Sequence, residues 1–98
     1  MLASMDGFAM EKIAGGKLLI VKTDHDEKIN KISIQGDFFA HPEESIDRIQ
    51  EELKGLQVGF EDSLVNEKLQ KLIDDNDYQL IGFDAEDLIR VLKRAISR

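Results

Sequence analysis

The feature that most constrains the fold is a change in hydrophobic spacing near residue 40. Before it, one run alternates, so that Ile32, Ile34 and Phe38 point to one side and polar residues to the other. After it, apolar residues recur at helical spacing. Strands followed by helices predict an α+β fold in which the helices pack on one face of an antiparallel sheet.

Three strands are expected in the first forty residues. Segments 17–23 and 31–38 are rich in residues that suit a pleated surface, and a weaker segment covers about 8–14. The pair Gly15-Gly16 is expected to form a turn, and the polar residues 24–28 to form a hairpin loop. The prediction is a three-stranded antiparallel sheet in the N-terminal half.

About three helices are expected after residue 40. Pro42 suits the first turn of one helix, and Gly55 suits its end. A second helix should cover about 61–74, and Asp84 should cap the last. The inner faces are expected to hold Ile46, Ile49 and Leu53 in the first helix, Leu64, Val65, Leu69, Leu72 and Ile73 in the second, and Leu88, Ile89, Val91, Leu92, Ala95 and Ile96 in the third.

Composition limits the classes of function. Ninety-eight residues suit one domain, 1–98, and the absence of cysteine excludes a disulfide scaffold, a cysteine metal site and a thiol nucleophile. A net charge of −7 argues against binding to nucleic acid or to an anionic membrane. The first six residues do not resemble a signal peptide, and no apolar run is long enough to span a bilayer. A cytoplasmic location is expected.

Few residues suggest catalysis. His25 is expected in the hairpin loop and His41 before Pro42, but no serine lies in a Gly-x-Ser-x-Gly turn, so we favour surface histidines. The acidic loop 24–27 lacks the spacing of a calcium loop, and we favour a solvated loop over a metal site. No catalytic residue and no metal ligand is assigned.

Two short segments could contact a ligand or a partner. Gly15, Gly16 and Lys17 could approach an anion, but the phosphate-binding loop spacing is absent, and we favour a simple turn. Phe38 and Phe39 have to point to opposite sides of a strand, which places Phe38 in the core. For Phe39, packing beneath the next helix is favoured over an exposed aromatic anchor for a partner.

These segments together resemble a known family. The runs Gly15-Gly16-Lys17-Leu18, Ile32 to Phe39, His41-Pro42-Glu43-Glu44 and Gly82 to Leu88 resemble the C-terminal domain of lipoate–protein ligases, over residues 12–95. The resemblance implies a fold like that of iron–sulfur scaffold proteins. It also implies a separate accessory subunit of a split, archaeal-type ligase, because the length of the large catalytic domain and its motifs are missing.

The resemblance implies a reaction and a partner. The family activates lipoate with Mg·ATP to lipoyl-AMP, then transfers the lipoyl group to a lysine of lipoyl acceptor domains of 2-oxoacid dehydrogenase or glycine cleavage complexes. The chain would form a heterodimer with the catalytic large subunit, without binding ATP, Mg or lipoate alone. Gly15, Gly16 and Lys17 would lie near the adenylate, and the partner interface would contain Asp37, Phe38, Phe39 and His41.

Two other classes of function remain open from the sequence. The chain could be a free-standing interaction module of the same fold, or an independent enzyme. A stable partner other than a ligase-sized catalytic protein would favour the first, and turnover by the isolated chain would favour the second.

Overall fold

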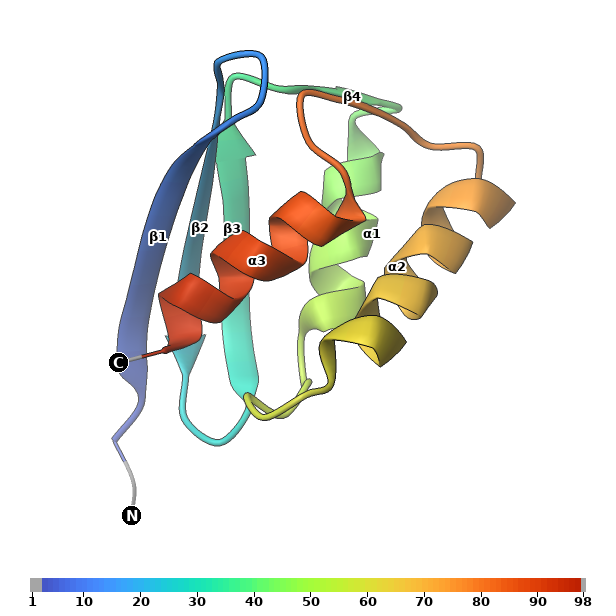
Figure 1. Cartoon of the computed structure of the whole chain (residues 1–98). Helices are drawn as coiled ribbons and strands as arrows, with labels where there is room; N and C mark the ends of the chain where they lie inside the picture. Colours follow the sequence, from blue (N-terminus) through green and yellow to red (C-terminus); the bar gives the residue numbers. More distant parts are fainter. Residues whose placement is uncertain (1–2, 98) are drawn as a thin grey trace.

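The computed structural model describes residues 3–97, and its sheet is covered on one face by helices (Figure 1). The chain forms β1 (Met5–Ile13), β2 (Lys17–His25), β3 (Ile29–Gly36), β4 (Phe39–His41), α1 (Glu44–Leu53), α2 (Asp62–Asp75), β5 (Gln79–Ile81) and α3 (Ala85–Ile96). The predicted α+β class, with a three-stranded antiparallel sheet in the N-terminal half and three helices, is confirmed.

The sheet buries one side because its strands alternate. Its order is β1-β2-β3, and Val21 of the central strand lies between Ala9 of β1 and Ile34 of β3, all three buried. The predicted turn at Gly15-Gly16 is confirmed, and both glycines have positive φ, which favours glycine over residues with a Cβ.

Helix α3 forms much of the core. It runs obliquely across the sheet and contacts β1 and β2 (Figure 1). Its six predicted inner residues are all buried. Asp84 caps the helix as predicted, because its carboxylate accepts the Asp87 N–H at 2.8 Å and the Asp87 carboxylate accepts the Asp84 N–H at 3.1 Å.

Ion pairs fasten the exposed side of α3 to β1. Glu11 accepts hydrogen bonds from Arg90 at 2.6 Å and from Arg94 at 3.0 Å. The hydrogen bond from Arg90 lowers the pKa of Glu11 below its ordinary value, and the same pairing raises the pKa of Arg90. Glu11 is therefore ionised at neutral pH and forms salt bridges with both arginines.

The hairpin between β2 and β3 differs from the prediction. His25 was expected in a loop but ends β2 on the buried face, 2% exposed, with Nδ1 2.8 Å from the Thr23 hydroxyl oxygen. The expectation of a surface histidine here is wrong. The hydrogen bond to Thr23 uses one ring nitrogen, whereas Nε2 is buried without a hydrogen-bond partner.

Other boundaries also shift. Leu64 was expected on the inner side of α2 but is 57% exposed, whereas Val65 and Leu69 are buried. The third strand ends at Gly36 instead of Phe38, and α1 begins at Glu44, two residues after Pro42. The short strands β4 and β5 pair in a second, two-stranded sheet that the sequence did not predict.

Two features are absent from residues 3–97. No helix in this range is both long and apolar enough to cross a membrane. The same range contains no group of three or more histidine, aspartate or glutamate side chains placed to hold a metal ion.

Candidate functional site

The sequence motifs that were far apart along the chain meet at one end of the molecule. The β1–β2 turn, β4 and the segment that leads into α3 lie together there (Figure 1, top). The Asp37 N–H donates to the Leu18 carbonyl at 3.0 Å, which joins the end of β3 to the start of β2. Gly36, at φ +152°, has no room for a Cβ because Leu18 O occupies that position.

The motif that begins at Gly82 also lies at this end of the molecule. A Cβ built on it would lie 3.1 Å from Phe38 Cβ and 3.2 Å from Lys17 Cγ. The stem of Lys17 and the side chain of Phe38 therefore both pack against the backbone of Gly82. The Phe38 ring also contacts the buried Phe83 edge to face, with ring centroids 4.7 Å apart.

The paired strands β4 and β5 form a small ribbon with two different faces. Ala40 and Leu80, directly opposite each other, are half-buried and point inward. Phe39 and Ile81, also opposite each other, point outward and are 74% and 60% exposed. The expectation that Phe39 packs beneath the next helix is wrong, and we call this outward pair the Phe39–Ile81 patch.

Acidic residues stand next to both strands of the ribbon in the sequence. Asp37 precedes β4, Glu43 follows it, and Asp77 precedes β5, and all three are exposed. None of them makes an ion pair within residues 3–97. A surface of this kind fits an apolar hollow surrounded by lysine or arginine.

The glycine turn has limited capacity to bind an anion. The Gly16 N–H donates to the Ile13 carbonyl at 2.8 Å, so the turn itself uses this donor. Lys17 is exposed, and its ammonium makes no ion pair with any described residue. The Lys17 ammonium is therefore a charged donor that this end of the molecule offers to a ligand.

The structure groups six of the seven predicted site residues closely. Gly15, Gly16 and Lys17 form the turn, while Asp37, Phe38 and Phe39 follow β3 beside it. His41 lies at the far end of β4, opposite Gln79. His25, at the other end of β2, is remote from His41, so the two histidines do not share a site (Figure 1).

Sequence reasoning missed Ile81. Its three-residue strand follows an acidic helix end and is too short to show a period. The neighbouring Gly82-Phe83-Asp84 motif was the available indication that this segment matters.

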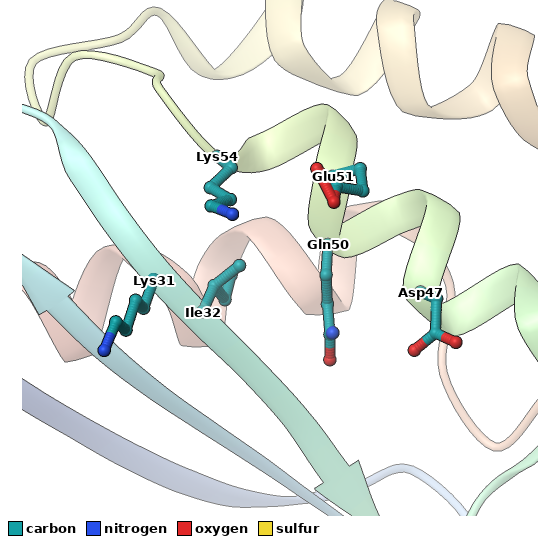
Figure 2. Close-up of a pocket in the computed structure, with 6 residues that line it drawn as sticks. All are labelled: Lys31, Ile32, Asp47, Gln50, Glu51 and Lys54. Carbon is teal, nitrogen blue, oxygen red and sulfur yellow. The ribbon is translucent and has the colours of Figure 1, made fainter.

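One hollow borders the ribbon, and a second lies away from it. One, of about 410 Å³, lies between α2, β5 and the start of α3, and Leu80 and Ile81 line part of it. The other, of about 530 Å³, lies between β3 and α1 (Figure 2) and contains none of the predicted site residues. It is lined by Lys31, Ile32, Asp47, Gln50, Glu51 and Lys54. Opposite charges on its walls give it no clear preference for an ion.

The comparison with solved structures supports the motif-based resemblance. One chain of an archaeal lipoylation system, a bi-partite lipoate protein ligase and its E2 lipoyl domain from Thermoplasma acidophilum, matches with a TM-score of 0.74. The two chains are 29% identical, and the match covers 91% of this chain and 96% of the other. Neither a family model nor a curated protein matches this chain. The resemblance to a lipoate–protein ligase system is confirmed, and the coverage is consistent with a small separate subunit.

Proposed function

We propose that this chain is the accessory subunit of a two-part lipoate–protein ligase, which docks on a catalytic large subunit and is needed to form lipoyl-AMP. The match to a component of a bi-partite ligase system supports a ligase-related role. The observation that carries the finer proposal is the convergence of Lys17, Phe38 and Gly82, because the motifs that carry the family resemblance meet there.

The docking surface in this proposal is the Phe39–Ile81 patch. Its two large side chains are mostly exposed, yet backbone pairing and the inward-facing Ala40 and Leu80 hold them in place. An ordered apolar pair loses little conformational freedom on binding, which favours its use as an anchor. The flanking acids and the net charge of −7 favour a basic partner surface.

The contribution to chemistry is positional. Activation joins the lipoate carboxylate to the α-phosphate of ATP and releases pyrophosphate, and the resulting acyl-adenylate is open to attack by water. A domain that closes over the cleft of the catalytic subunit excludes water and orders the loops around the adenylate. ATP, Mg and lipoate are substrates of the complex in this scheme, and this chain supplies no catalytic residue.

The test is pyrophosphate exchange. The chain is used to isolate its catalytic partner from extract, and lipoate-dependent ATP–pyrophosphate exchange is measured with and without the chain. We expect exchange to fall by at least about tenfold without it, a loss of about 1.4 kcal/mol of stabilisation. Lipoyl transfer from preformed lipoyl-AMP should depend on the chain less. Equal exchange in both samples would exclude the activating role.

Lys17 has a specific expected effect. Lys17→Ala should lower the exchange rate about threefold to tenfold, because the ammonium is solvent-exposed and unpaired among the described residues. Loss of the packing of the Lys17 stem against Gly82 should lower Tm by no more than a few degrees. Lys17→Arg should retain most of the rate. Lys22→Ala, at an exposed lysine of the same strand, is the control. If a folded Lys17→Ala protein exchanges at the normal rate, Lys17 belongs only to the turn.

A further inference from the structure

The two edges of the main sheet differ, because within residues 3–97 the β3 edge is covered by other parts of the chain and the β1 edge is not. Along β3, the Ile34 N–H donates to Gln50 Oε1 at 2.9 Å, and Ile29 exchanges backbone hydrogen bonds with Gly55 and Leu56. Figure 2 shows α1 alongside this edge. Along β1, residues 6–12 make main-chain hydrogen bonds with β2 alone. The β1 edge is the open one.

An open edge of this length is unusual in a stable monomer. Strand β1 spans nine residues without proline, and it pairs with β2 without a bulge. Such an edge offers a template for another strand unless it is covered or interrupted. Phe8 and Met10 add apolar surface beside it, 57% and 49% exposed.

The sequence of β1 complements itself when it is reversed about Ala9. In an antiparallel pair of two β1 strands centred on this residue, Asp6 lies opposite Lys12 of the other copy, and Phe8 lies opposite Met10. Both pairs occur twice because of the two-fold symmetry. Opposite charges and an aromatic–sulfur contact are favourable cross-strand neighbours.

We propose that the β1 edge is a self-association surface, through which two copies of this chain join their sheets into one antiparallel sheet of six strands. The β1 strand of the second copy occupies the edge, and no two like charges lie opposite each other in this register. On the helix-covered side, Gly7 lies opposite Glu11 of the other copy, so the Glu11 carboxylate, which is paired with Arg90, faces no second charge across the pair.

Two copies could instead stack the uncovered faces of their sheets, which would also bury Phe8 and Met10, but this arrangement is less favourable. Lys22 of the central strand is exposed on that face, so stacking would remove its charge from water. Edge pairing leaves Lys22 in solvent.

The surface is separate from the Phe39–Ile81 patch. Strands β2 and β3 lie between the β1 edge and the ribbon of β4 and β5 (Figure 1). Two copies joined through β1 can therefore each dock on a partner, and failure of either interaction leaves the other testable.

The test is sedimentation equilibrium of the full chain from about 10 µM to about 1 mM, a range that covers a weak dimer. We expect a dimer that grows with concentration. Asp6→Lys and Lys12→Asp should each raise its dissociation constant about tenfold, because attraction becomes repulsion at two symmetric positions. An equal mixture of these two variants should recover the normal constant, since every opposed pair in the mixed dimer is again of opposite charge. Lys22→Asp should leave the constant unchanged.

Amide exchange measured by NMR identifies the mode of association. Edge pairing should slow the exchange of alternate β1 amides as concentration rises, whereas face stacking adds no hydrogen bonds to them. A chain that stays monomeric throughout the range would overturn the proposal. The proposal would also be overturned if the charge reversals left the dissociation constant unchanged, or if the equal mixture of variants failed to recover the normal constant. Exchange of the β1 amides that does not change with concentration would overturn it as well.

Discussion

Replacing Phe39 by aspartate is expected to abolish the action of this chain on its catalytic partner while leaving the domain folded. The ring is 74% exposed, so its loss removes little packing from the chain. In the complex, the substitution removes an apolar anchor and brings a charge into its place. Loss of such an anchor costs about 2–4 kcal/mol of binding free energy, or roughly 30-fold to 1,000-fold in affinity.

The measurement is the affinity of the variant for the catalytic subunit, by calorimetry, together with pyrophosphate exchange. Ile81→Asp should have a similar effect because Ile81 lies directly opposite Phe39. The double variant should lose less than the sum of the two single losses, since both substitutions disrupt one contact surface.

Leu64→Asp provides the matched control. Leu64 is a large apolar side chain on α2, 57% exposed and outside the ribbon. The same chemical change there should leave affinity and exchange unchanged. If Phe39→Asp and Leu64→Asp behave alike, the patch is an ordinary exposed apolar surface and not the docking site.

Much of the fold could be predicted because strong local patterns agree with the tertiary structure. The alternation through Ile32 and Ile34, the cap at Asp84 and the apolar face of α3 each specify an element without knowledge of its neighbours. The turn at Gly15-Gly16 follows from positive φ at these glycines, whereas α1 ends at Leu53, two residues before the predicted Gly55.

The errors concern positions where distant contacts decide the outcome. His25 is buried with Nδ1 against the Thr23 hydroxyl, and a polar run has the composition of a loop whether or not one of its members packs inside. Leu64 is one of five apolar residues on α2, but the helix fully buries only Val65 and Leu69. Ile81 becomes part of the patch only because β5 pairs with β4, which places it opposite Phe39, a residue far away in the sequence.

The candidate site could be predicted as a set of motifs but not as a surface. The sequence identifies Phe38 and Phe39 as neighbours with opposite directions, and the structure assigns Phe38 to the Phe83 contact and Phe39 to solvent. That assignment depends on where β3 ends. Gly36 decides this point, because its backbone lies against Leu18 in a way that no other residue allows.

Gly36→Ala should therefore both destabilise the domain and disturb the site. The residue has φ +152°, and a Cβ would overlap the Leu18 carbonyl oxygen, a backbone atom fixed within β2. Strained backbone of this kind costs about 1–3 kcal/mol, and the overlap adds to it. We expect a total loss of about 3 kcal/mol in the free energy of unfolding, which lowers Tm by about 12–24 °C in a domain of this size.

Gly59→Ala is the control for this prediction, because a Cβ there meets no atom within 4 Å. It should change Tm by no more than a few degrees, as expected for a surface substitution. Thermal unfolding followed by circular dichroism compares the two variants. Below its lowered Tm, Gly36→Ala should still bind the catalytic subunit more weakly, because the shift of Asp37 also displaces Phe39. If Gly36→Ala has normal stability, the backbone at Leu18 shifts enough to accommodate the added methyl group. If the variant is less stable but binds with normal affinity, β5 and not the end of β3 determines the position of Phe39.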